Sequence, residues 1–439
     1  MNTSLEALLA QKEYHCSCGK THRAGFSRSV ISSGAVRDLP GIVRSYGAGK
    51  VFLLADPNTY AAAGDAVCRV LREAGISCSV YLLPGKRTEP DEAAVGSIAM
   101  HFDRSAELIL GVGSGVINDL GKILALLTGL PYVIFGTAPS MDGYASGTSS
   151  VIRDGLKYSL PSQCADTVVG DLDILCAAPM RMILAGLGDM LAKYVSLAEW
   201  RMAHVITGEY YCPEIAELVK AALDRCVSQM DLLPSRDPDA IREVMNGMVL
   251  SGVAANYAGV SRPASGMEHY LSHICDMRAV EFGTPMDLHG IQCGAATVIT
   301  LSLYEKLRDF TPNREQALAY VRSFSYDRWK AALRERLGKS AEAMIAGEER
   351  EQKYDPARHA ERLDRILAHW DEIRSIIRSL PDSKPLADRM RAIGMPTSFT
   401  ELGFSDEDTR YAILMSKDIR DKYVGSRLFW DLGILEELV

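Results

Sequence analysis

The sequence lacks the features that mark several large classes of protein. No uninterrupted apolar run approaches the roughly 20 residues that a membrane-spanning helix needs, so we expect no membrane insertion. The net charge of −8 offers no electrostatic case for binding a phosphate backbone, so we expect no nucleic-acid partner. There is no internal repeat and no low-complexity tract. With 47% hydrophobic and 24% charged residues in 439 positions, the composition indicates a globular enzyme with two domains.

A disulfide framework is also missing. Ten cysteines scattered over a chain of this length differ from the dense pattern of small secreted proteins. The start, MNTSLEALLAQKEYHCSCGK, has an acidic residue and no long apolar block, unlike a secretory signal. We therefore expect a cytoplasmic protein. One cluster, with Cys16, Cys18 and His22 at its centre, has residue types that bind zinc. Its spacing is tight and no second cysteine pair follows nearby, which favours a turn with free thiols.

Strands and helices alternate in the first part of the chain. Short apolar strands are predicted at 51–55, 78–83, 108–112 and 132–135, and helices at 61–74 and 116–127. This alternation is typical of a parallel sheet with helices on both faces. A hairpin with an Asp154-Gly155 turn is predicted over 149–160. After Pro179 the apolar spacing is helical, and the charged stretch 339–379 is predicted to form a pair of solvated surface helices. The sequence thus predicts an α/β Rossmann-like domain over 1–180 and an all-α domain over 181–439.

The strand at 108–112 leads into a glycine-rich turn, Gly113-Ser114-Gly115, and then into a helix. Glycines let a ligand approach the backbone, and the N–H groups at a helix start favour an anionic phosphate. The Gly-x-Gly-x-x-Gly dinucleotide fingerprint is not matched. Glycine at such a junction can also serve packing alone, so the turn by itself is a moderate signal for phosphate binding.

Asp56 follows the strand at 51–55 and precedes Pro57-Asn58-Thr59. An acid at the carboxyl end of a strand can accept hydrogen bonds from the ribose of a dinucleotide. It can equally cap the helix that follows. The two roles are compatible and both stay open. Asp56 would repel a 2′-phosphate, whereas Lys86 and Arg87 in the loop after the next strand would offset that repulsion.

Three well-separated residues, Asp189, His269 and His289, occur in settings typical of a divalent-metal site. Ser265-Gly-Met-Glu268 is a capping-box pattern, so a helix is predicted to begin at Ser265, with His269 and His273 on one face. His289 precedes an apolar helix, and Asp189 lies early in the helix after the predicted boundary. Two histidines and a carboxylate with an open position suit zinc, nickel or iron(II).

Several segments occur together in a characteristic order: Gly111–Lys122, Thr137–Ser146, Gly186–Lys193, Ser265–His269 and His289–Gly294. In this order they resemble the iron-containing alcohol dehydrogenase and dehydroquinate synthase-like superfamily, with one extra residue in the spacer of the first segment. Within it, the sequence is most similar to the sn-glycerol-1-phosphate dehydrogenase family, in its bacterial AraM-like branch. The resemblance extends from about residue 40 to 310, and more loosely to the end of the chain.

The resemblance implies roles for individual residues in a cleft between the two domains. It places the metal ligands on Asp189, His269 and His289, and roles near the reacting atoms on Asp142, His273 and Lys193. The cofactor, NAD(H) or NADP(H), is expected to contact Asp56, Asn58, Gly113, Ser114, Gly115, Asp119, Thr137, Ser140 and Ser146, with Lys122 supporting the turn. A homo-oligomer, expected to be a dimer, is implied as well.

The activity implied by the resemblance is the reversible, metal-dependent reduction of dihydroxyacetone phosphate to sn-glycerol 1-phosphate. Candidates to hold the phosphate of this small three-carbon substrate are Arg262, Lys193, Arg420 and Arg427. A polyol dehydrogenase acting on a non-phosphorylated substrate such as glycerol is one alternative. A dehydroquinate synthase-like cyclase is a weaker alternative. Dehydroquinate synthases resemble a pattern with glutamate as the first ligand and a lysine three residues later, whereas here the first ligand is Asp189 and the lysine follows it by four residues. A regulator that has lost its metal is disfavoured, since all three ligands are present.

Overall fold

Six strands form a fully parallel sheet in the computed structural model, which describes residues 13–23, 25–85, 88–153 and 156–439. They are β3 (Arg28–Ser32), β4 (Lys50–Ala55), β5 (Ser77–Leu82), β6 (Leu108–Gly113), β7 (Tyr132–Gly136) and β10 (Thr167–Asp171). Their order across the sheet is β3-β10-β7-β6-β4-β5. The predicted parallel sheet is confirmed. Two of its strands, β3 and β10, are additional to the predicted set.

The chain divides into two units, each with its own dense internal packing. The first contains residues 1–190 and 214–261, and the second contains residues 191–213 and 262–439. The division into functional domains at residue 180 stays a prediction.

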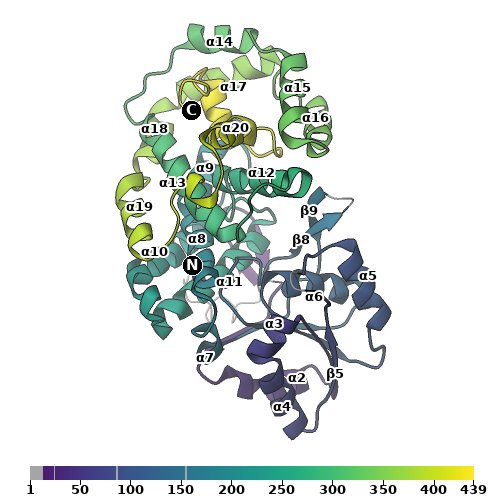
Figure 1. Cartoon of the computed structure of the whole chain (residues 1–439). Helices are drawn as coiled ribbons and strands as arrows, with labels where there is room; N and C mark the ends of the chain where they lie inside the picture. Colours follow the sequence, from purple (N-terminus) through teal and green to yellow (C-terminus); the bar gives the residue numbers. More distant parts are fainter. Residues whose placement is uncertain (1–12, 24, 86–87, 154–155) are drawn as a thin grey trace. The chain divides into compact units, whose positions relative to one another are not determined.

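Helices cover both faces of the sheet in the first unit (Figure 1). On one face, α2 (Leu39–Ser45) and α4 (Asp65–Glu73) pack on alternate residues of β4, which include the buried Val51 and Leu53. On the other face, α6 (Gly115–Thr128) runs beside α5 (Glu92–His101). Alternate strand residues point to opposite faces, and the central strands β6 and β7 are buried at every position, as expected for a sheet covered on both sides.

Two antiparallel hairpins accompany the sheet. The first pairs β1 (Glu13–His15) with β2 (Thr21–Arg23), and the second pairs β8 (Thr148–Arg153) with β9 (Leu156–Pro161). The second hairpin confirms the one predicted, although its Asp154-Gly155 turn lies outside the described residues. The other elements of this unit are η1 (Ala35–Asp38), α3 (Pro57–Thr59), η2 (Tyr60–Gly64), α7 (Leu172–Leu175), α8 (Met180–Leu191), α10 (Pro213–Gln229), η3 (Met230–Ser235) and α11 (Pro238–Ala258).

Every described element of the second unit is a helix, as the apolar spacing predicts. They are α9 (Lys193–Thr207), α12 (Met267–Phe282), α13 (His289–Glu305), α14 (Arg314–Arg322), α15 (Tyr326–Leu337), α16 (Ser340–Glu351), α17 (Pro356–Ala368), α18 (Trp370–Arg378), α19 (Ser383–Ala392), η4 (Thr400–Leu402), α20 (Asp406–Ser416) and α21 (Gly425–Asp431). Of these, α12 and α13 pack closely against each other. No described helix combines the length and apolar character needed to cross a membrane.

The charged stretch 339–379 differs from its prediction. It forms three helices, α16, α17 and α18, rather than a pair. Each one buries apolar side chains, such as Ile345, Leu363 and Ile373. Most of the charged residues are exposed or partly exposed, with Glu348 a buried exception, so the high charge hid an amphipathic pattern.

Candidate functional site

The order of strands in the sheet locates a place where ligands of such folds bind. From β4 the chain goes to β5 on one side, and then returns to β6 on the other side. The strand order therefore reverses between β4 and β6. In open parallel sheets, ligands bind outside the carboxyl ends of the strands at such a point. Asp56 follows β4 and the turn Gly113-Ser114-Gly115 follows β6, so the topology places both predicted cofactor segments at the reversal.

The glycine-rich turn connects β6 tightly to α6. A Cβ atom added to Gly113 would lie 2.5 Å from Cγ1 of Ile117, so only glycine allows this approach of strand and helix. A Cβ atom added to Gly115 would lie 3.1 Å from Cγ of Met141. The amide of Thr137, which follows β7, donates to the carbonyl oxygen of Gly113 at 3.0 Å. Packing thus explains the first glycine, and the helix start that follows has the backbone geometry suited to an anion.

Polar residues buried on α6 hold the loop between β7 and β8. Nζ of Lys122 lies 2.9 Å from Oδ1 of Asp119 and 3.2 Å from the carbonyl oxygen of Gly143. It also donates to Oγ of Ser146 at 3.3 Å and to the carbonyl oxygen of Thr148. Lys122 is fully buried. Asp119 and Lys122 therefore support the loop at 143–148, and Ser146 is part of that support.

The same loop carries Asp142, which lies next to the predicted metal ligand Asp189. The amide of Asp142 donates to Oδ2 of Asp189 at 2.9 Å, and Oδ2 of Asp142 accepts from Oγ of Ser251 at 2.8 Å. A Cβ added to Gly186 would lie 2.0 Å from the carbonyl oxygen of Pro139. Glycine there lets α8 approach the loop backbone, one helical turn before Asp189. Within the first unit, the structure thus brings these two predicted site residues together.

Asp56 caps a helix, as one of its two predicted roles requires. Oδ1 accepts from the amides of Asn58 and Thr59 at 2.8 and 2.9 Å, and the amide of Asp56 donates to Oγ1 of Thr59 at 3.0 Å. This is a complete capping box. Asn58 is exposed. Contacts of both residues with a cofactor stay a prediction, and Lys86 and Arg87 lie outside the described residues.

In the second unit, His269 and His289 face each other from α12 and α13. Their ring centroids are 5.1 Å apart. Nδ1 of the buried His269 lies 2.8 Å from Oε1 of Glu268, and Nδ1 of His289 lies 3.0 Å from Oγ of Ser272. Metal-binding histidines usually make such a bond with one ring nitrogen, which leaves the other for the metal. In both residues, Nδ1 is the nitrogen that makes this bond.

Three further side chains lie next to this pair of histidines. Sγ of Cys293 lies 3.5 Å from Nε2 of His289, one turn along the same helix. Sequence reasoning missed Cys293, although its spacing of four residues from His289 was a usable signal. His273 stacks on His289 with ring centroids 5.8 Å apart. The donor atoms of His273, Asp276 and His289 all lie within 4.8 Å of one another.

The start of α12 differs by one residue from its prediction. Gly266 is the N-cap, and Glu268 reaches back to accept from the amide of Gly266 at 2.7 Å. Ser265 does not cap the helix, because its Oγ accepts from Nζ of Lys422 at 2.7 Å. Burial raises the pKa of Glu268 to about 7. It also raises the pKa of Glu199, whose carboxylate accepts from the amide of Met267 at 2.9 Å, to about 8.

The basic residues predicted to hold a phosphate occupy unexpected positions. Lys193 is fully buried, and its Nζ donates to the carbonyl oxygen of Ala264 at 2.7 Å. Lys193 is therefore not a solvated surface lysine. It also lies on a different helix from Asp189, because α8 ends at Leu191 and α9 begins at Lys193.

Two of the predicted arginines are committed to internal contacts. Arg262 pairs with Glu209 at 2.6 Å and donates to the carbonyl oxygen of Tyr423 at 2.8 Å. Arg427 is buried over the ring of Tyr354, at 4.7 Å from the centroid. The contacts of Arg262 are better explained by a structural role.

Lys422 is a candidate cation that the sequence did not reveal. Its Nζ bonds Oγ of Ser265, four residues before His269. Burial, together with the charges of Arg262 and Arg420, lowers its pKa to about 7. Arg420 is half-buried. These cations gather at the start of the helix that carries the histidines.

Comparisons with known proteins show which family the chain belongs to. The family model for iron-containing alcohol dehydrogenase matches residues 30–179. The glycerol-1-phosphate dehydrogenase [NAD(P)+] of Bacillus licheniformis is 30% identical over 428 residues, which cover 97% of this chain and 94% of that protein. The enzyme of the same name from Geobacillus stearothermophilus is 30% identical over 444 residues, covering 100% and 99%. The chain belongs to the glycerol-1-phosphate dehydrogenase family.

The fold of this family member is shared with solved enzymes of lower sequence similarity. The crystal structure of glycerol dehydrogenase from Schizosaccharomyces pombe has a TM-score of 0.61 and 16% identity, and the match covers 94% of this chain and 89% of that one. The names of the relatives and of the family model identify an NAD(P)-dependent, metal-containing dehydrogenase family. The resemblance read from the sequence motifs is therefore confirmed.

Proposed function

We propose that the protein catalyses the reversible, NAD(P)-dependent reduction of dihydroxyacetone phosphate to sn-glycerol 1-phosphate. The observation that carries this proposal is the 30% identity with glycerol-1-phosphate dehydrogenases over nearly the full length of both chains. The strand-order reversal, with Asp56 on one side and the glycine-rich turn on the other, supports it as a dinucleotide site. In this proposal, Gly113, Ser114 and Gly115 hold the pyrophosphate, and Thr137 and Ser140 lie beside the nicotinamide.

The proposed metal ligands are Asp189, His269 and His289. Their donor set suits a divalent ion, because both imidazoles have Nδ1 in a hydrogen bond and Nε2 on the other side of the ring. Zinc, nickel and iron(II) all accept such ligands. The bound ion would supply a Lewis acid for the substrate's carbonyl group. Cys293, with its sulfur beside Nε2 of His289, is a further donor within the second unit.

The protein's own contribution is to position the substrate. Asp142 is fixed by Ser251 and by Asp189, so its carboxylate is a fixed acceptor for a substrate hydroxyl. We assign the phosphate to Lys422, with Lys193 adding positive charge behind the same segment, Ala264–Ser265. His269, in the first turn of α12, follows this segment by four residues in the sequence. We therefore place the three-carbon ester between the ion and the ammonium group. His273 is the proposed acid–base group, since it stacks on His289.

The test compares two substrates and several metals. The purified protein is stripped of metal, reloaded with zinc, nickel or iron(II), and assayed with NADH or NADPH. We expect dihydroxyacetone phosphate to be reduced with a far higher kcat/KM than dihydroxyacetone, and chiral analysis to identify sn-glycerol 1-phosphate. A preference for dihydroxyacetone would reject the phosphate ester and favour a polyol dehydrogenase. Activity that survives metal removal would reject the proposed ligand set.

The oligomeric state and the cellular compartment belong to the same proposal. We propose a cytoplasmic homodimer, on the resemblance and on the scattered cysteines. Light scattering on the purified protein measures the first directly, and a mass of one chain would contradict it.

A further inference from the structure

The hairpin of β1 and β2 places sulfur and imidazole groups on one side of a tight turn. The amide of Cys16 donates to the carbonyl oxygen of Lys20 at 3.0 Å, and the amide of Gly19 donates to the carbonyl oxygen of Cys16 at 3.1 Å. Gly19 has a φ of 84°, in the left-handed region that glycine tolerates best. Residues alternate along the hairpin, so Cys16 and Cys18 are half-buried while His15 and Ser17 are exposed.

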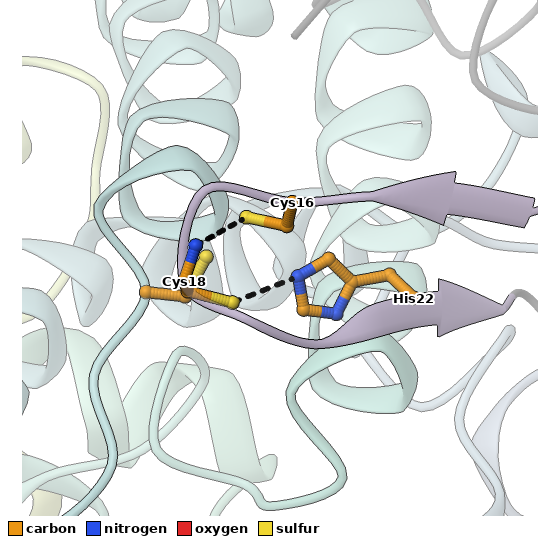
Figure 2. Close-up of side chains that lie close together, drawn as sticks. Cys16, Cys18 and His22 are labelled. Atoms are coloured by element: carbon orange, nitrogen blue, oxygen red, sulfur yellow. Dashed lines mark hydrogen bonds between the residues drawn. The ribbon is translucent and has the colours of Figure 1, made fainter.

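The donor atoms of Cys16, Cys18 and His22 lie within 4.8 Å of one another. Figure 2 shows the sulfur of Cys18 directed at the ring of His22, and the sulfur of Cys16 facing the backbone amide of Cys18. The Sγ–Nε2 distance between Cys18 and His22 is 3.4 Å. Around a tetrahedral zinc ion, sulfur and nitrogen ligands are about 3.6 Å apart, given bonds of roughly 2.3 and 2.0 Å. The observed separation is already close to that value.

Hydrogen bonds around the cluster suit a bound cation. The amide of Cys18 donates to Sγ of Cys16 at 3.4 Å, which stabilises a thiolate on that sulfur. Nδ1 of His22 lies 2.8 Å from the carbonyl oxygen of Tyr257. A carbonyl only accepts, so this contact fixes the proton on Nδ1 and leaves the lone pair on Nε2. Such a bond to a backbone carbonyl is the usual support of a metal-binding histidine.

We propose that Cys16, Cys18 and His22 bind a structural zinc ion, separate from the metal that the dehydrogenase reaction uses. Binding displaces the thiol protons of both cysteines to solvent and leaves His22 neutral. Two thiolates and one Zn²⁺ ion have no net charge, which favours a half-buried position. The fourth position is filled by a water molecule or by a ligand outside the hairpin. This inference does not depend on the proposed substrate.

The site would attach the hairpin to helices that shape the active-site loop. Glu214, at the start of α10, accepts from the hydroxyl of Tyr14 and from Oγ of Ser17 at 2.7 Å. His22 is buried against Tyr257 of α11, with ring centroids 5.6 Å apart. The neighbouring Asn256 donates to the carbonyl oxygen of Ala145 at 2.7 Å and accepts from the amide of Gly147 at 3.0 Å. A metal at the hairpin would therefore stabilise the end of α11 that holds this loop.

Metal content and cobalt spectra of the full-length protein test the proposal. Elemental analysis of the protein purified with zinc is expected to give one equivalent per chain beyond the catalytic ion. Cobalt substitution, in a Cys293→Ser background that removes the sulfur beside His289, is expected to give a sulfur-to-cobalt charge-transfer band. Both signals should be lost in Cys16→Ser with Cys18→Ser, and in His22→Gln. In the same substitutions made with Cys293 intact, the melting temperature should fall while the catalytic equivalent of metal remains bound.

Matched controls come from the same unit. His15→Gln changes the exposed histidine of the same hairpin, and Cys176→Ser changes a half-buried cysteine elsewhere, so both should keep the additional equivalent. If the cysteine variants do not fold, a mercurial reagent on the Cys293→Ser protein decides, since modifying its thiols should release the additional equivalent of zinc to a chelating dye. Absence of that equivalent, an unchanged cobalt band in His22→Gln, or a disulfide between Cys16 and Cys18 in the purified protein would each overturn the proposal.

Discussion

Replacing Lys422 by methionine isolates the charge that is proposed to hold the substrate's phosphate. Methionine keeps the length and apolar stem of lysine, so the change removes chiefly the ammonium group and its bonds to Ser265. A hydrogen bond to a charged group contributes about 1.5–3 kcal/mol, which corresponds to roughly a tenfold to more than a hundredfold change in affinity. We expect KM for dihydroxyacetone phosphate to rise by such a factor, with little change in KM for dihydroxyacetone.

The lowered pKa of Lys422 adds a pH dependence of known sign. With a pKa of about 7, lowered chiefly by burial, the lysine of the free enzyme is protonated below pH 7 and loses its charge as the pH rises. The phosphate ester is already a dianion there, since its second pKa is about 6. If only the protonated lysine binds it, KM should rise about fivefold between pH 7 and pH 8. This rise should disappear in Lys422→Met.

The assay measures KM for both substrates from pH 6.5 to 8.5, and the ratio of the two values removes effects on the hydride step. Lys384→Met is a suitable control, because the side chain of Lys384 is 86% exposed and belongs to the same unit. An unchanged KM ratio and pH profile in Lys422→Met would refute the reasoning, and would leave Lys422 as a residue that only orients Ser265.

Four other outcomes follow from the described contacts. Chelation, or Asp189→Ala, should abolish turnover while fluorescence still reports NADH binding; loss of that binding would contradict separate cofactor and metal sites. Asp56→Asn should raise the kcat/KM ratio of NADPH to NADH several-fold, since asparagine caps a helix equally well, and an unchanged ratio would make Asp56 a cap only. Lys193→Met should raise KM for the phosphate ester more than KM for dihydroxyacetone, and an equal rise would limit Lys193 to holding Ala264. Burial lowers the pKa of His359, so below about pH 6.5 the unfolded chain takes up a proton that the folded chain resists. The unfolding free energy should therefore fall by up to about 1.4 kcal/mol for each unit that the pH is lowered in this range. In denaturant titrations, His359→Gln should remove this contribution to the slope.

The central part of the fold was predictable because its signals are local. The apolar runs that became β4, β6 and β7 are bounded by turn residues, and Asp154-Gly155 marked the hairpin. The two strands β3 and β10 were missed for different reasons. Residues 28–32 form an edge strand and are only partly buried, so the apolar pattern is weak. In β10 the run Thr167–Asp171 is short, and its burial depends on neighbours distant in the sequence.

The candidate site was predictable only where a motif carried it. The motifs indicated Asp189, His269 and His289, because carboxylate and imidazole are groups that bind divalent metals, and their role as ligands stays a prediction. Lys422 was missed because no motif surrounds it, and its contact with Ser265 joins residues 157 positions apart. The burial of Lys193 was not predictable for a similar reason, since its ammonium donates to the carbonyl oxygen of Ala264, 71 positions away in the sequence.

The loop that follows β7 carries its own reporters of active-site geometry. The amides of Asp142 and Gly147 donate to side chains, those of Asp189 and Asn256, rather than to backbone carbonyls. Their hydrogen-exchange rates therefore follow the positions of two individual side chains instead of the stability of a helix or strand. Exchange at the first amide would respond to an ion reaching the Asp189 carboxylate, and exchange at the second to loosening of α11. Two neighbouring amide signals thus distinguish loss of the catalytic metal from release of the N-terminal hairpin, without any assay of turnover.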